Sequence, residues 1–152
     1  MNPDSRTPPV GVPFDSDDPN NRCFGCSPDN EQGLRMAFVK TGCHAVEAHY
    51  EVAEHFCGAP QVVHGGIQAT MLDEVLGFAC RTAFADDDVD GLQIVTAEFS
   101  LRYRIPVPTG VQLLLRGEVE RTEGRNIFVK GAILDDAERE LTRGEARWVR
   151  LA

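Results

Sequence analysis

The chain has 152 residues, of which 42% are hydrophobic, and a formal net charge of −9. This length fits one domain with a buried core, and the negative charge argues against general binding to nucleic acid or anionic membranes. Because the five cysteines are an odd number, and neither a secretory signal nor 18 consecutive apolar residues appear, we expect reduced thiols in a cytoplasmic protein.

Residues 1–21 are predicted to form a flexible N-terminal tail, because they are rich in proline and aspartate and poor in apolar side chains. Residues 22–152 are assigned to one folded domain. Near its start, Cys23 and Cys26 form a Cys-x-x-Cys motif, a candidate zinc site with Cys43, His44 or Cys57 as further ligands. No second pair follows at zinc-ribbon spacing, and no strand–helix setting favours redox chemistry. We therefore interpret this segment as a small packed loop and expect no metal.

Two strands are predicted next, at residues 34–39 and 45–52, joined by a turn at Thr41-Gly42. In the second strand, apolar side chains alternate with polar ones, which is typical of a strand with one buried face.

A long helix follows from about Gly65 to Phe84, with few polar residues and no proline. This composition predicts a helix that is buried over most of its circumference. Asp73 lies on a stripe of small residues of this helix, where a carboxylate is costly to bury without a function. The alternative interpretation is an ordinary core helix with a solvated aspartate.

The two glycines at the start of the helix, Gly65 and Gly66, leave its first N–H groups open to a ligand oxygen. Such a positive helix end is a candidate oxyanion hole. Asp73 lies eight residues later, roughly 12 Å along the helix. If both groups act on one small carbonyl, we expect the second to come from another copy of the chain.

After the helix, residues 86–91 are predicted to form a solvated acidic loop, and the rest of the chain alternates like strands. The predicted strands span 95–105, 111–121, 126–134 and 141–149, with tight turns at Glu123-Gly124 and 135–138. Pro106 and Pro108 end the first of them. A single helix cannot cover both faces of such a sheet. The sequence therefore predicts an α+β fold in which a curved antiparallel sheet of about six strands wraps one long helix.

Five segments together resemble hotdog-fold acyl-CoA thioesterases, in particular phenylacetyl-CoA thioesterases and the acyl-CoA thioesterase superfamily members of animals. These segments are residues 23–26 (Cys-Phe-Gly-Cys), 63–74 (Val-His-Gly-Gly-Ile-Gln-Ala-Thr-Met-Leu-Asp-Glu), 96–97, 103–108 and 123–125. The resemblance implies the hotdog fold and hydrolysis of acyl-CoA without a metal or cofactor, in homodimers or homotetramers. It also implies that Asp73 is the general base or the nucleophile, and that the Gly65 N–H of another subunit polarises the carbonyl.

The resemblance implies further roles. Thr96 would orient water or substrate, although it also fits a strand threonine that faces the helix. His64 would contact the substrate, although it also fits a helix cap. Gln61 is the nearest amide, because Gly58 stands where some relatives have asparagine. The expected CoA-binding residues, of which each arginine also fits a solvated charge, are Gly66, Arg102, Arg104, Gly124, Arg125 and Asn126.

Two other functions remain open. The loop at residues 55–60 (His-Phe-Cys-Gly-Ala-Pro) loosely resembles that of hotdog hydroxyacyl dehydratases, which need a glutamate fourteen residues after this histidine; Ala69 stands there and cannot transfer a proton. The second alternative is a non-catalytic acyl-CoA-binding regulatory domain, because a fold does not by itself establish chemistry.

Overall fold

The computed structural model describes residues 10–14, 19–84 and 93–151, and the predicted acidic loop at 86–91 lies outside them. The described residues form six strands, one α-helix and a short 3₁₀ turn. Their bounds are β1 (Val39–Gly42), β2 (Ala45–Glu51), η2 (Glu54–Phe56), α1 (Gly65–Arg81), β3 (Ile94–Tyr103), β4 (Gln112–Glu123), β5 (Asn126–Leu134) and β6 (Glu140–Arg150).

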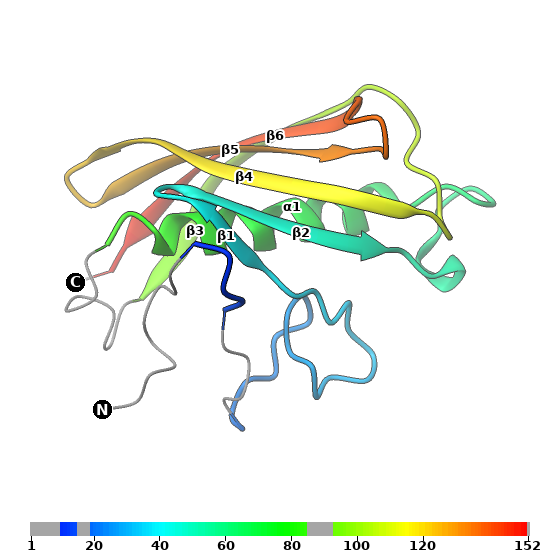
Figure 1. The fold of residues 1–152 in the computed structure, drawn as a ribbon, viewed down its shortest axis with the longest axis horizontal. Helices are drawn as coiled ribbons and strands as arrows, with labels where there is room; N and C mark the ends of the chain where they lie inside the picture. Colours follow the sequence, from blue (N-terminus) through cyan, green and yellow to red (C-terminus); the bar gives the residue numbers. More distant parts are fainter. Residues whose placement is uncertain (1–9, 15–18, 85–92, 152) are drawn as a thin grey trace.

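The six strands form one antiparallel sheet in the order β1-β2-β4-β5-β6-β3. The sheet curves over α1, which lies against its concave face (Figure 1). This arrangement confirms the predicted fold class of one helix wrapped by a curved antiparallel sheet. Among the described residues, β1 and β3 are the two edge strands of this six-stranded sheet.

The core lies between α1 and the middle strands of the sheet. Apolar helix residues at spacings of three and four are fully buried, namely Met71, Leu72, Val75, Leu76 and Ala79. Burial of each larger side chain in this set contributes roughly 1.5–3 kcal/mol to folding. The helix approaches β4 and β5 closely where these strands carry glycine: a Cβ atom on Gly117 would lie 2.9 Å from the Val75 carbonyl oxygen.

The prediction of a strand at residues 34–39 is wrong, and so is the turn at Thr41-Gly42. Residues 34–38 lie outside the sheet, and Arg35 among them has a left-handed φ of 54°; β1 begins at Val39, and the turn falls at residues 43–44. Leu34, Met36 and Phe38 are buried alternately, which reproduces the period of a strand. Their backbone bonds differ, because the N–H groups of Leu34 and Met36 donate to the Cys-x-x-Cys loop rather than to a strand.

The strict alternation predicted for residues 95–105 is also wrong at its start. The pairing of β3 with β6 shifts between Thr96 and Glu98, so Ala97 is an extra residue in the ladder. Such a β-bulge reverses which side chains face the core. Val95 is 43% exposed, and Thr96 turns toward α1.

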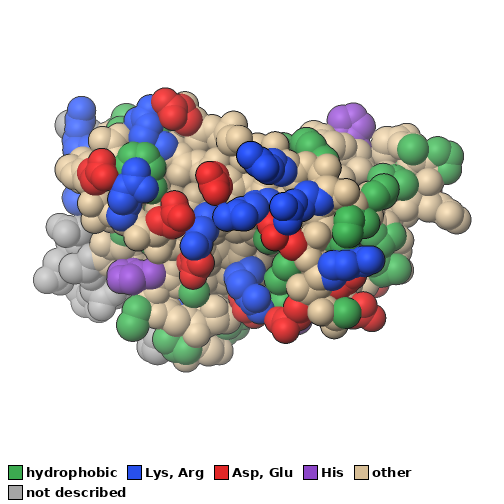
Figure 2. Space-filling model, turned by 90° about the horizontal axis from the view of Figure 1, so that it is seen from above, with side chains coloured by type: hydrophobic (Ala, Val, Ile, Leu, Met, Phe, Trp, Pro, Cys, Tyr) green, Lys and Arg blue, Asp and Glu red, His purple; other side chains and the backbone are tan. Residues whose placement is uncertain are grey.

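The convex face of the sheet is covered by ion pairs. Basic and acidic side chains lie interspersed there (Figure 2), and they include Arg116 with Glu47 and Arg147 with Glu98, at 2.9 and 3.0 Å. Such pairs at exposed positions stabilise little, but they indicate a face in contact with solvent.

No helix formed by the described residues is both long enough and apolar enough to cross a membrane.

Part of the predicted tail is described. Residues 10–14 lie along β1: the Gly11 N–H donates to the Lys40 carbonyl at 2.8 Å, and the Phe14 N–H to Phe38 at 3.0 Å. The Phe14 ring packs edge-on against Phe78 of α1, with 5.0 Å between the ring centroids.

Candidate active site

Asp73 and Thr96 form a hydrogen-bonded pair on the side of α1 that faces the edge strand β3. The Thr96 hydroxyl donates to Asp73 Oδ1 over 2.7 Å. Burial raises the pKa of Asp73, and the bond from Thr96 offsets part of that rise. The pair therefore holds a half-buried carboxylate in a fixed orientation, with Oδ2 left to act on a water molecule or a substrate.

The bulge in β3 is what brings Thr96 to Asp73. Thr96 stands opposite Trp148 of β6, and Phe99 stands opposite Ala146. Because Trp148 and Ala146 are two residues apart on one strand, Thr96 and Phe99 share the helix-facing side despite being three residues apart.

The first turn of α1 presents N–H groups that no hydrogen bond found in the described residues uses. His64 is the N-cap, and its Nδ1 accepts the Gly66 N–H at 2.9 Å. That bond confirms the capping interpretation of His64. It also means that Gly66 does not offer its N–H to a ligand in this arrangement. None of the hydrogen bonds found in the described parts of the chain uses the Gly65 N–H, which leaves it as a donor at the positive end of the helix.

Tyr103, which the sequence analysis did not single out as a site residue, fixes the same turn from β3. Its hydroxyl donates to the Gly65 carbonyl oxygen over 2.8 Å. Tyr103 as a whole is 53% exposed, because it lies on the edge strand beside the helix entry. The contact between Tyr103 and the start of α1 depends on how β3 lies beside the helix, which the sequence alone does not show.

Within one chain, the Gly65 N–H and the Asp73 carboxylate are not brought together. Both groups are on α1, eight residues and roughly 12 Å apart. β3 ties the helix at both places, through Tyr103 near its start and Thr96 at its middle. The two groups therefore stand at separate points along one rigid element.

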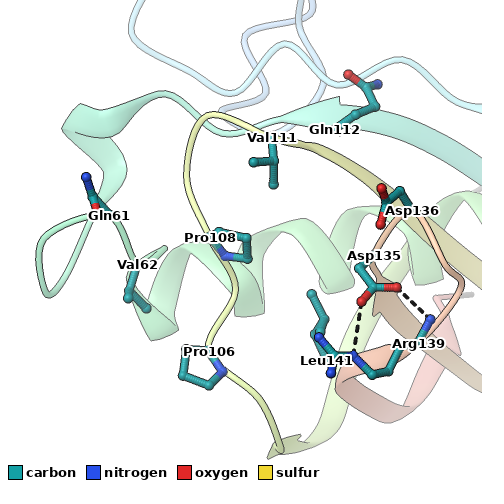
Figure 3. Close-up of a pocket in the computed structure, with 10 residues that line it drawn as sticks. All are labelled: Gln61, Val62, Pro106, Pro108, Val111, Gln112, Asp135, Asp136, Arg139 and Leu141. Atoms are coloured by element: carbon teal, nitrogen blue, oxygen red, sulfur yellow. Dashed lines mark hydrogen bonds and ion pairs between the residues drawn. The ribbon is translucent and has the colours of Figure 1, made fainter.

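Gln61 lies on the loop before α1, in a left-handed conformation with φ of 63°. Its N–H donates to a Glu54 carboxylate oxygen at 3.1 Å, and its carbonyl oxygen accepts the Thr109 N–H. Gln61 and Val62 border a groove of about 410 Å³ between this loop, the β3–β4 connection and the β5–β6 turn (Figure 3). Asp73 does not line this groove.

Arg102 and Arg104 lie together at the end of β3 nearest the start of α1. With Ser100, Arg143 and Glu145 they line a second hollow, of about 260 Å³. Arg102 stands directly opposite Arg143 on β6, so two like charges face each other there. Arg104 is 3.5 Å from a Glu140 carboxylate oxygen.

The other expected CoA-binding residues lie in the β4–β5 hairpin. Gly124 has φ of +59°, as the tight turn requires. The Asn126 side chain accepts a hydrogen bond from Arg147 at 2.9 Å, and the Arg125 carbonyl oxygen accepts one from Arg150. Arg102 of β3 pairs with Arg143 of β6, which in turn pairs with Ala132 of β5. Ala132 is six residues from Asn126 along β5. The hairpin and the Arg102 hollow are thus roughly 20 Å apart.

Glu74 links the Cys-x-x-Cys loop to the helix, which the sequence analysis did not foresee. The Cys23 thiol donates to Glu74 Oε1 over 3.3 Å. Burial raises the pKa of Glu74, and the bonds from the two thiols counteract it. Cys43, His44 and Cys57, the ligands considered from the sequence, do not belong to this group.

Comparison with known proteins gives one family. The sequence model of the thioesterase superfamily matches residues 60–142, which include α1 and β3 to β5. The acyl-coenzyme A thioesterase THEM4 of Rattus norvegicus is 31% identical over 98 residues, which are 64% of this chain and 39% of THEM4. The chain spans less than half the length of the curated relatives it matches.

Solved structures agree with this result. A crystal structure described as a thioesterase superfamily protein is 27% identical with a TM-score of 0.72, and the match covers 80% of this chain and 57% of that chain. A protein from Bacillus halodurans, solved with CoA, is 25% identical with a TM-score of 0.61, covering 69% of this chain and 66% of that chain.

Proposed function

This chain belongs to the thioesterase superfamily, and from that premise we propose that it hydrolyses an acyl-CoA thioester to the free acid and CoA. The observation that carries the proposal is the Asp73–Thr96 pair on a helix whose start leaves the Gly65 N–H free. The relative named as an acyl-coenzyme A thioesterase and the structure solved with CoA support the substrate class.

In the proposed reaction, Asp73 acts on the thioester carbonyl carbon. As general base it takes a proton from water while the water oxygen forms the new bond to carbon. As nucleophile its own oxygen forms that bond, and water then hydrolyses the acyl intermediate. In both routes Thr96 orients the carboxylate, and the bond from carbon to sulfur breaks to release the CoA thiolate, which takes up a proton. No cofactor enters either route.

The developing negative charge on the carbonyl oxygen needs a donor, and the Gly65 N–H fits that role. It is unused, it is next to the positive end of α1, and no side chain at Gly65 hinders approach. Because it lies roughly 12 Å from Asp73 on the same helix, we assign the donor for each site to a second copy of the chain.

The edge strand β3 supports such an assembly. No strand formed by the described residues lies on its outer side, and it exposes Val95 and Tyr103, which are 43% and 53% exposed. An open edge with exposed apolar side chains is a surface that natural proteins cover. We propose a homodimer, or a homotetramer built from two dimers, in which this surface is covered by another copy.

The CoA phosphates would bind the arginines near the helix entry. Arg102 has no acidic partner among its described neighbours, and it lies opposite Arg143. Arg143 is already 3.4 Å from a Glu145 carboxylate oxygen, so an anion in this hollow would bind chiefly to the Arg102 guanidinium. Arg125 would be a second contact, for a CoA molecule bound mainly by the neighbouring subunit.

We further propose that the enzyme lies in the cytoplasm, with which the five free thiols agree.

The test is release of free thiol from a panel of acyl-CoA thioesters by the purified protein. Asp73→Asn preserves the size of the side chain but removes the base, so it should lower kcat at least about 10²-fold while the unfolding temperature changes little. Glu98→Gln, at an exposed β3 position, is the matched control and should keep full activity. Thiol release that is unchanged in Asp73→Asn would reject the assigned base. CoA binding without turnover by the unmodified protein would instead favour the regulatory domain.

A further inference from the structure

The Cys-x-x-Cys loop and α1 together hold a cluster of metal-ligating side chains outside the proposed active site. Cys23 Sγ, Cys26 Sγ and a Glu74 carboxylate oxygen all lie within 4.8 Å of one another, and all three residues are partly buried. Glu74 is 48 residues from Cys26 in the sequence, so the cluster is a product of the tertiary fold.

The spacing of these atoms suits a small divalent cation. In a tetrahedral zinc site, Zn–S distances of about 2.3 Å and Zn–O distances of about 2.0–2.2 Å place ligand atoms roughly 3.5–3.8 Å apart. Cys23 Sγ and Glu74 Oε1 already lie 3.3 Å apart. Binding would therefore need shifts of about 1 Å or less elsewhere in the cluster, which side-chain rotation can supply.

The loop is shaped around Glu74. Gly25 stands between the two cysteines, and a Cβ atom there would lie 2.2 Å from Glu74 Cγ. The loop is held by backbone bonds on both sides: the Ser27 N–H donates to Cys23, and the Met36 N–H donates to Gly25. A ligand set on such a fixed loop is preorganised, which favours cation binding.

The donor set distinguishes zinc from other candidates. Thiolates favour zinc over magnesium or calcium, which prefer oxygen ligands. Zinc also accepts a carboxylate oxygen as a ligand, so two thiolates and one carboxylate suit it. A disulfide between Cys23 and Cys26 explains less, because it would remove the thiol that donates to Glu74 and leave that buried carboxylate without this partner.

We propose that Cys23, Cys26 and Glu74 bind one Zn²⁺ ion, with water as the fourth ligand. The ion would tie the Cys-x-x-Cys loop to α1 at the residue next to Asp73, and it would take no part in the hydrolysis. The inference does not rest on the proposed function, because zinc binding is measured without any substrate.

The first experiment measures zinc by mass spectrometry in full-length protein that was stripped with a chelator, incubated with zinc chloride and desalted. We expect close to one zinc ion per chain in the unmodified protein, and loss of the bound zinc in Cys26→Ser and Glu74→Gln. Cys43→Ser is the matched control, since Cys43 is exposed and outside the cluster, and it should keep its zinc. Replacement of zinc by cobalt should give a thiolate-to-cobalt charge-transfer absorption.

Two further measurements guard against loss of folding in the variants. Zinc should raise the unfolding temperature of the stripped unmodified protein but not that of stripped Glu74→Gln. Gly25→Ala removes no ligand but displaces Glu74, so it should weaken zinc affinity by about tenfold or more. The proposal is overturned if the unmodified protein retains no more zinc than a Cys23→Ser/Cys26→Ser double variant. It is equally overturned if the stripped protein, kept without oxidant, contains a Cys23–Cys26 disulfide.

Discussion

At the scale of single residues, the candidate site depends on one carboxylate and one hydroxyl. The sequence identifies Asp73, because an acidic residue among small and apolar helix residues is conspicuous. The role of Thr96 depends on a 2.7 Å bond that requires the bulge at Ala97, which the alternation of residues does not reveal. The hydroxyl stabilises the charged form of Asp73 against burial.

Replacing Thr96 by valine removes this donor while keeping the shape of the side chain. Loss of the bond raises the pKa of Asp73, so less of the ionised base is present as the pH falls. We expect the acid limb of the pH profile of kcat/KM to move to higher pH. At the pH optimum, kcat should fall about tenfold, as expected for one hydrogen bond to a charged group. Thr96→Ser restores the hydroxyl and should restore both values; a Thr96→Val profile identical to that of the unmodified protein would refute the role.

The Gly65 donor can be deleted without disturbing the helix. Proline lacks an N–H but is favoured at the first position of a helix, and His64 before it already has φ of −55° and ψ of 136°, which suits a residue preceding proline. Gly65→Pro should lower kcat about 10²- to 10³-fold, the usual cost of one oxyanion donor. Circular dichroism should show unchanged helix content.

Gly65→Ala is the matched control for this substitution. It keeps the N–H, and its Cβ atom would lie 3.6 Å from the Tyr103 ring, an ordinary contact. It should therefore retain most of the activity. Equal losses in the two variants would show that space at this position matters, and that the N–H does not.

At the scale of elements, the sequence predicts most of the fold. The helix, five of the six strands and the β4–β5 turn follow from periodicity and turn residues, because these signals are local. The first strand was misplaced, since Leu34, Met36 and Phe38 are buried alternately without pairing in the sheet. Burial and strand pairing give the same period of two, and only backbone contacts distinguish them. The same limit explains why the phase of β3 at Thr96 was not predicted.

The packing of α1 against the sheet includes one buried polar link. Thr142 of β6 donates to the Gln68 side-chain oxygen at 2.6 Å, and the Gln68 amide donates to the Val63 carbonyl at 3.0 Å. Both side chains are almost fully buried. Thr142→Val leaves the Gln68 oxygen unsatisfied, so we expect a loss of about 1–3 kcal/mol in the free energy of unfolding, measured by urea denaturation. Thr122→Val, at an exposed position of β4, should change it by less than about 0.5 kcal/mol.

At the scale of the whole molecule, the described residues form one sheet and one helix, but one chain supplies only half of the groups of each proposed active site. The sequence permits this inference from helix geometry alone, because Gly65 and Asp73 are roughly 12 Å apart on one rigid element. The structure adds that β3 fixes both positions through Tyr103 and Thr96. The surface that would receive a second copy is the open side of β3.

A mixture of two inactive variants tests this arrangement directly. In a twofold dimer with shared sites, one chain carrying Asp73→Asn and one carrying Gly65→Pro form one site with both defects and one intact site. Random pairing makes half of the dimers mixed, so co-expression should yield about a quarter of the unmodified activity per chain, well above the mean of the two parents.

The control for this experiment pairs Asp73→Asn with the double variant Asp73→Asn/Gly65→Pro, from which no intact site can arise. Size-exclusion chromatography with light scattering confirms that the mixed species has the mass of the parent assemblies. If both groups acted within one chain, every site in the first mixture would carry one defect, and activity would equal the parental mean. Recovery to a quarter therefore requires that the N–H and the carboxylate of a working site come from different chains, because no other pairing of these two defects leaves a site whole.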